Sequence, residues 1–202
     1  LIIRALCKEN FEIKNLSTSD DTRNLRQALN ASTKTIDINH AGTAFRFLTS
    51  FLTLKYGKEF ILTGSDRLKE RPIKDLVEVL QRMGAKIEYI QEEGFAPLKI
   101  LGVKLSGGCI KINGGISSQF ISAVLLISPN LDNGIELTIT GDLVSKPYIL
   151  MTLKLMGKFG VKWTWIGNII TIRKQDYKAK NYKVESDWSS ASFWFQIASL
   201  SE

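Results

Sequence analysis

The apolar and polar positions of this chain repeat in long blocks. Two blocks share the end of a strand, a polar loop with a proline, an amphipathic run that closes in glycine, and an alternating strand: residues 63–90, TGSDRLKERPIKDLVEVLQRMGAKIEYI, and residues 140–166, TGDLVSKPYILMTLKLMGKFGVKWTWI. Residues 15–38 form a weaker copy, in which Leu25 and Leu29 lie one helical turn apart on one face. Each copy predicts an amphipathic helix followed by a strand.

A second kind of segment lies between these blocks, with small and polar residues at its front and apolar residues behind. Its copies are AGTAFRFLTSFL from Ala41, GISSQFISAVLLI from Gly115 and DWSSASFWFQIASL from Asp187. The opening LIIRALC has the character of the back half of one more copy. The chain therefore alternates helices of two kinds, each followed by strands. Its first and last residues fall inside helices of the second kind, so we expect an excerpt of a longer protein.

Composition narrows the class of protein. With 44% hydrophobic and 23% charged residues, the 202-residue chain has enough apolar material for one large core or two small ones. No apolar run reaches the roughly 18 residues of a membrane span, and LIIRALCKEN lacks the features of a secretory signal, so we expect a cytoplasmic protein without membrane contacts. Cys7, Cys109 and a single histidine cannot assemble a cysteine and histidine metal site. Neither a metal nor a cofactor is predicted.

The net charge of +7 raises the question of a polyanionic partner. The lysines and arginines are scattered along the chain, and no nucleic-acid-binding motif accompanies them. We therefore expect no nucleic-acid partner and instead a preference for small anions.

Helix N-termini are the candidate sites for such anions. Gly42 and Thr43 open one helix of the second kind, and Ser117, Ser118 and Gln119 open the next. Backbone N–H groups at a helix start lack intrahelical partners and can bind a phosphate or carboxylate. The plain structural alternative is that Thr43 and Ser117 are ordinary N-caps. If the repeats surround a common axis, the loops with Arg67 and with SKPY converge on the same end, which favours the anion site.

Several strings together resemble the 5-enolpyruvylshikimate-3-phosphate synthase family in order and spacing. They are HAGTAFRFL, LTGSDRLKERPIKDLVEVLQRMGAKIEY, GGISSQFISAVLL, GDLVSKPYILMTLKLMGKFGV and ESDWSSAS. The resemblance implies a transferase that joins the enolpyruvyl group of phosphoenolpyruvate to the 5-hydroxyl of shikimate 3-phosphate and releases phosphate. This reaction belongs to the shikimate pathway towards chorismate and the aromatic amino acids.

The resemblance also implies an α/β fold. Members of the family have two similar domains, each built from three βαβαββ units about a pseudo-threefold axis, with buried helices and outer sheets. Residues 1–184 would correspond to the continuous domain, with its first helix truncated, and residues 185–202 to the crossover and the truncated first helix of the other domain. The full-length parent is expected to be a monomer.

Site residues follow from the resemblance position by position. It implies that phosphoenolpyruvate is bound by Gly42, Arg67 and Gln119, and shikimate 3-phosphate by Ser117, Ser118, Gln119, Ser145 and Tyr148. Lys69 and Arg71 are interpreted as structural, and Pro72 as a first-turn residue of the next helix. His40 replaces an asparagine that is usual in the family.

The groups that the family uses for proton transfer have no counterpart in these residues. No catalytic residue is therefore predicted here, and the isolated chain is expected to bind its substrates without turning them over. Two other functions remain open. One is the related transferase that acts on UDP-N-acetylglucosamine, although SSQF and SKPY point away from it. The other is a non-catalytic anion-binding module.

Overall fold

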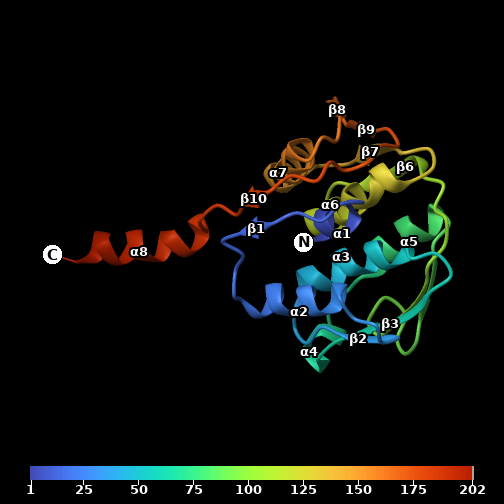
Figure 1. Ribbon diagram of the computed structural model, residues 1–202, viewed down its shortest axis with the longest axis horizontal. Helices are drawn as coiled ribbons and strands as arrows, with labels where there is room; N and C mark the ends of the chain where they lie inside the picture. Colours follow the sequence, from blue (N-terminus) through green and yellow to red (C-terminus); the bar gives the residue numbers. More distant parts are fainter. Residues whose placement is uncertain (202) are drawn as a thin grey trace.

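The computed structural model describes residues 1–201. A compact body carries two four-stranded sheets on opposite sides of a group of helices, and the last helix, α8 (Trp188–Leu200), extends away from that body (Figure 1). Among the described residues, no helix combines the length and apolar character needed to cross a bilayer.

The two four-stranded sheets belong to units of identical topology. Each unit runs strand, helix, strand, helix, strand, strand, with the first two strands parallel and the remaining pairings antiparallel. The first unit comprises β2 (Thr35–Asp37), α3 (Gly42–Thr53), β3 (Glu59–Thr63), the short α4 (Asp66–Lys69), α5 (Lys74–Arg82), β4 (Lys86–Tyr89) and β5 (Leu98–Leu101). The second comprises β6 (Gly108–Asn113), α6 (Ser118–Ile127), the 3-10 turn η1 (Ser128–Asn130), β7 (Ile135–Thr140), α7 (Lys146–Lys158), β8 (Trp163–Ile166) and β9 (Ile169–Ile172).

Segments from the beginning and the end of the chain together form part of a third unit. It consists of α1 (Ile2–Leu6), β1 (Ile13–Lys14), α2 (Asp20–Leu29) and β10 (Tyr182–Lys183), and β1 pairs with β10 in parallel, as β2 pairs with β3 and β6 with β7. The predicted α/β class is confirmed, with two complete βαβαββ units and one partial unit in residues 1–201. The pseudo-threefold axis stays a prediction.

The helices and strands predicted from the repeats are present. The amphipathic runs form α2, α5 and α7, and the segments with polar fronts form α1, α3, α6 and α8. One local prediction was wrong: Pro72 is not in the first turn of a helix, because α5 begins only at Lys74, with Ile73 as its N-cap. The preceding residues instead form the separate turn of α4, which ends with Glu70 as its C-cap.

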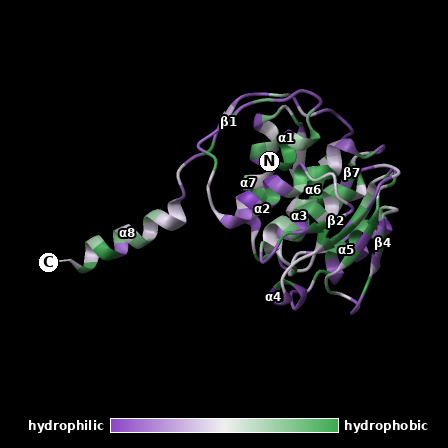
Figure 2. Ribbon diagram, turned by 60° about the horizontal axis from the view of Figure 1, so that its bottom comes forward, coloured by the Kyte–Doolittle hydropathy of each residue, from purple (hydrophilic) through white to green (hydrophobic). Residues whose placement is uncertain are grey.

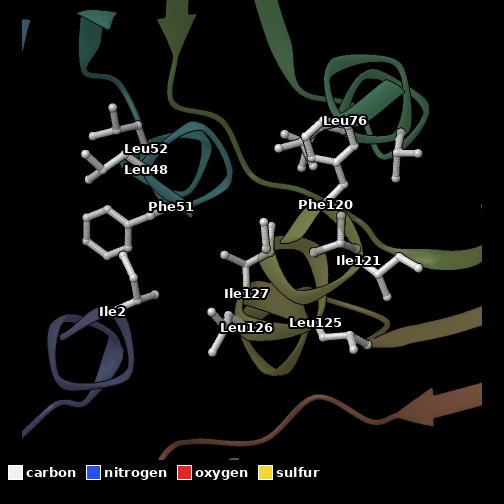
Figure 3. Packing of buried hydrophobic residues seen from close by; sticks show 14 of the residues in the cluster. Ile2, Leu48, Phe51, Leu52, Leu76, Phe120, Ile121, Leu125, Leu126 and Ile127 are labelled. Carbon is white, nitrogen blue, oxygen red and sulfur yellow. The ribbon is translucent and has the colours of Figure 1, made fainter. Parts of the chain in front are cut away.

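The core is centred on α3 and α6. Eight of the ten residues of α6 are buried, because α1, α3, α5 and α7 all contact it. A helix surrounded in this way has apolar residues on every face. Figure 3 shows Phe51 of α3 directed towards Ile2 of α1, and Phe120 of α6 directed towards Leu76 of α5. The sheets cover this helical layer with strands in which every second residue is buried, as in β7, where Ile135, Leu137 and Ile139 are buried.

Helix α8 contributes nothing to this core. None of its residues is buried, and its large apolar side chains, among them Trp188, Trp194 and Leu200, are 59–77% exposed. Figure 2 shows this helix, with its hydrophobic positions, standing clear of the body. The free energy that stabilises the body therefore does not depend on α8.

Removal of residues 187–202 should leave the midpoint of thermal unfolding of the body unchanged, because no buried contact is lost, and should reduce aggregation by removing exposed apolar surface. Differential scanning calorimetry and light scattering measure the two effects. As a control, Leu153→Ala in α7, at a fully buried position, should lower the free energy of unfolding by about 2–5 kcal/mol. If the truncated chain were as unstable as Leu153→Ala, the conclusion that the body does not depend on α8 for its stability would be wrong.

Candidate anion-binding site

The first turns of α3, α6 and α7 lie side by side. Gln119 in α6 is hydrogen-bonded to Thr43 and Arg46 of α3, and Ser122 of α6 is hydrogen-bonded to Thr152 of α7 at 2.8 Å. Each bond joins the first two turns of neighbouring helices. Two helix starts predicted from the polar segment fronts, those of α3 and α6, thus lie together with the start of α7 at one end of the body.

The three helix starts differ in how their N–H groups are satisfied. The N-cap of α3 is Ala41, which has no side-chain acceptor, and Ser145 at the N-cap of α7 forms no capping bond. Ser117 does cap α6, since its Oγ accepts a hydrogen bond from the backbone N–H of Gln119 at 3.4 Å. The N-cap interpretation therefore holds for Ser117 and not for Thr43, which lies inside the first turn of α3. Uncapped N–H groups at a helix start are free to bind an anion.

Gly42 is in close contact with an arginine from a distant loop. A Cβ added to Gly42 would lie 2.1 Å from Nη1 of Arg71 and 3.2 Å from Nη1 of Arg46. Only glycine therefore allows the guanidinium of Arg71 to lie against the start of α3. Two guanidinium groups converge at this helix N-terminus, where the helix dipole already favours negative charge.

Neither of these cations has a carboxylate partner among residues 1–201. Arg46 is only 8% exposed, and its buried Nε has no hydrogen-bond partner in the part of the chain described. Burial, and after it the positive charge of Arg71, lower the pKa of Arg46. A buried cation without a counter-charge is costly, so this arrangement is suited to receive an anion.

Arg46 is held in place by α6. Its Nη1 donates to Oε1 of Gln119 at 2.9 Å, and Nε2 of Gln119 donates to Oγ1 of Thr43 at 3.0 Å. The guanidinium carbon of Arg46 also lies 5.3 Å from the centre of the Phe120 ring, within the range of a cation–π contact. The side chain of Gln119 is therefore fixed between two residues of α3.

The remaining predicted residues line the starts of α6 and α7. Ser118 is the first residue of α6 and is half-buried, whereas Ser117 is exposed. Ser145 precedes α7, and Tyr148 in the first turn of α7 is 62% exposed. His40 is exposed, with Nε2 3.9 Å from Oδ2 of Asp20. No group of three or more His, Cys, Asp or Glu side chains in residues 1–201 is arranged to hold a metal ion.

Comparison with known proteins is consistent with this geometry. The family model described as EPSP synthase (3-phosphoshikimate 1-carboxyvinyltransferase) matches residues 2–202. The chain belongs to the EPSP synthase family. A 3-phosphoshikimate 1-carboxyvinyltransferase from Bacteroides fragilis (strain YCH46) is 48% identical over 202 residues, which are 100% of this chain and 49% of that protein. The enzyme of that name from Mannheimia haemolytica is 37% identical over 241 residues, covering 99% of this chain and 54% of its own length.

The solved structures agree on the fold. EPSP synthase from Acinetobacter baumannii superimposes with a TM-score of 0.80 at 22% identity, covering 96% of this chain and 49% of the other. The chain thus spans about half the length of the relatives it matches. These matches do not favour the alternative function raised by the sequence, that of a transferase acting on UDP-N-acetylglucosamine.

Within this member of the EPSP synthase family, the structure separates the cations of GSDRLKERPI. Lys69 forms an ion pair with Asp66 at 3.1 Å, as its structural interpretation requires. Arg67 is exposed in α4, and the arginine of this loop that lies against Gly42 is Arg71. The structural interpretation of Arg71 is not supported, since its side chain has no ion pair within residues 1–201. The role of Arg67 stays a prediction.

Arg46 was not among the site residues predicted from the sequence. One signal was available: a single arginine in the otherwise uncharged segment AGTAFRFLTSFL, one helical turn after Gly42. On an otherwise buried helix, such a charge marks either a buried ion pair or a ligand site. No comparable signal existed for Arg71, whose contact with Gly42 joins distant parts of the chain.

Inorganic phosphate should stabilise this chain against heat, because in the folded state its negative charge would offset the two guanidinium charges at the start of α3. At a phosphate concentration a hundred times the dissociation constant, the gain in the free energy of unfolding is about 2.7 kcal/mol. Arg71→Met should abolish most of this gain, and Arg67→Met, which removes the same charge from the same loop, should retain it. Thermal unfolding in phosphate and in chloride of equal ionic strength measures the gain. The reverse ranking of the two variants would favour Arg67 as the ligand-facing residue.

Proposed function

We propose that this chain is the substrate-positioning half of a 3-phosphoshikimate 1-carboxyvinyltransferase. The complete enzyme transfers the enolpyruvyl group of phosphoenolpyruvate to the 5-hydroxyl of shikimate 3-phosphate and releases phosphate. Membership of the EPSP synthase family supports the reaction class. The observation that carries the proposal is the pair of guanidinium groups, Arg46 and Arg71, which converge on Gly42 without a carboxylate partner in residues 1–201.

The start of α3 forms the phosphoenolpyruvate end of the proposed site. Gly42 offers its backbone N–H, and Gln119 lies beside it through the bond to Thr43. We assign to Arg71 the role that the family resemblance suggested for Arg67, since its guanidinium is already against Gly42. A planar guanidinium binds a carboxylate or phosphate through two parallel hydrogen bonds, which fixes the orientation of the ligand as well as its position.

The starts of α6 and α7 form the shikimate 3-phosphate end. Ser117, Ser118 and Ser145 present hydroxyl groups that suit a phosphate, and the exposed ring of Tyr148 suits the carbon ring of the substrate. Gln119 lies between this end and Gly42, so it contacts both ligands in the proposed arrangement.

The role of this chain in the reaction is positioning. It holds two anionic substrates next to each other, which lowers the entropic barrier of a reaction between two molecules. During transfer, the methylene carbon of phosphoenolpyruvate gains a proton and becomes a methyl group, while the 5-hydroxyl oxygen attacks the neighbouring carbon and loses its proton. The C–O bond to phosphate then breaks as the methyl group gives up a proton, which restores the C=C bond of the enolpyruvyl group. The acid and base that move these protons are not among the residues assigned here.

We further propose the domain division at about residue 184, with residues 185–202 opening a second domain. The exposed apolar side chains of α8 support this division, because such a surface is normally covered by other protein. A cytoplasmic location and a monomeric parent belong to the same proposal.

Shikimate 3-phosphate should bind the chain more tightly than phosphoenolpyruvate, because more of its predicted contacts lie here. Isothermal titration calorimetry measures both affinities. The double variant Ser117→Ala with Ser118→Ala should weaken binding of shikimate 3-phosphate about tenfold or more, since a hydrogen bond to a charged group contributes about 1.5–3 kcal/mol.

A matched control for that variant is Ser189→Ala with Ser190→Ala, which alters two adjacent serines at the start of α8, away from the site. It should leave the affinity unchanged. Equal affinities for the two ligands, or equal effects of the two serine pairs, would count against the assigned site.

The chain by itself should not release phosphate from a mixture of phosphoenolpyruvate and shikimate 3-phosphate, because it positions the substrates without a proton donor for the methylene carbon. A coupled phosphate assay on the purified chain tests this. Release above the rate in buffer, and its loss in Arg71→Met, would show that this half contains a catalytic acid after all.

A further inference from the structure

Arg46 determines the orientation of the Gln119 side-chain amide. The guanidinium has N–H donors and no acceptor, so the Gln119 atom that it binds must be the oxygen. The 2.9 Å bond from Nη1 of Arg46 to Oε1 of Gln119 has this polarity. Turning the amide over would place its NH2 group against the guanidinium, with two donors facing each other.

The opposite end of the amide then has a spare donor. Nε2 of Gln119 has two N–H groups and donates one of them to Oγ1 of Thr43 at 3.0 Å. No second hydrogen bond from Nε2 occurs within residues 1–201. With its oxygen held by Arg46, Gln119 offers an unused N–H beside the first turn of α3, where Gly42 and Arg71 meet.

The stability of the fold does not explain why an arginine occupies this position. Its Nε is buried without a partner, it lies beside the like charge of Arg71, and it has no carboxylate partner in the described part of the chain. An apolar side chain of similar length at this position would avoid the cost of burying the charge. Within residues 1–201, the one hydrogen bond of the Arg46 side chain is with Gln119.

We propose that Arg46 is a positioning residue for the anion site. It holds the amide of Gln119 with the oxygen inward, so that the free N–H of Nε2 is available to a phosphate or carboxylate bound by Arg71 and the first turn of α3. Without Arg46, the amide can turn and present its oxygen to the anion, which repels it. The ligand named in this inference rests on the proposed function, whereas the amide orientation does not.

The orientation is tested without any ligand. The side-chain amide signals of Gln119 are assigned in a 15N–1H NMR spectrum by their absence from Gln119→Met. In the unmodified chain, nuclear Overhauser contacts should join these protons to the side chain of Thr43. Arg46→Met should lose the contacts, and Arg46→Lys, whose ammonium is also only a donor, should keep them. Arg82→Met, an equal loss of charge at the exposed end of α5, serves as control.

The effect on binding is tested by a double-mutant cycle with shikimate 3-phosphate as the probe. Arg46→Met should weaken binding about tenfold in the unmodified chain and less than about threefold in a Gln119→Met background, because the lost charge acts in both backgrounds and the amide only in one. The unfolding midpoint of each variant is measured in parallel, to separate binding from stability. Arg46→Lys covers the case in which Arg46→Met does not fold, and should keep affinity within about threefold of the original.

Each result has a definite meaning. Unchanged Thr43 contacts in Arg46→Met, or equal effects of Arg46→Met in both backgrounds, would overturn the inference while leaving the proposed function intact. If shikimate 3-phosphate and inorganic phosphate both fail to bind the unmodified chain, the proposed function fails. The NMR contacts in the unliganded chain then still decide the orientation of Gln119.

Discussion

The burial of α6 on every side is the constraint on which the rest of this structure depends. Because α1, α3, α5 and α7 surround it, its polar residues are confined to its first two turns, where Ser122 is hydrogen-bonded to Thr152. The same packing holds α3 and α7 beside it, with their first turns at the same end. A set of unsatisfied N–H groups and hydroxyls therefore gathers where the buried layer ends, and this is the place where the helix dipoles favour an anion.

The polar contacts at that end work against stability. Arg46 and Arg71 are like charges in contact with the same glycine, and Arg46 is almost fully buried. In the proposed site, a bound anion would offset their mutual repulsion and supply the counter-charge that Arg46 lacks, so groups that weaken the unliganded fold would favour binding. The large apolar core of the two complete units supplies the stability that tolerates this arrangement.

The proposed site is formed by three helix starts and one loop, and α8 leaves the body with its apolar side chains exposed. Since the chain spans about half the length of its relatives, a second wall with further cations fits the proposed reaction, which brings two anionic substrates together.

The sequence by itself determined the helices, the strands and the repeats, because the 3.6-residue and two-residue periods that define them are local. It also identified the helix starts at Gly42 and Ser117, since small and hydroxyl residues before an apolar run are a local signal. The contact of Arg71 with Gly42 was not a local feature. It depends on the separate turn of α4, which ends at Glu70 and leaves Arg71 to cross to Gly42. The link from Arg46 to Gln119 likewise arises only when two helices distant in sequence pack side by side, so the tertiary structure alone decided which charges meet at the site.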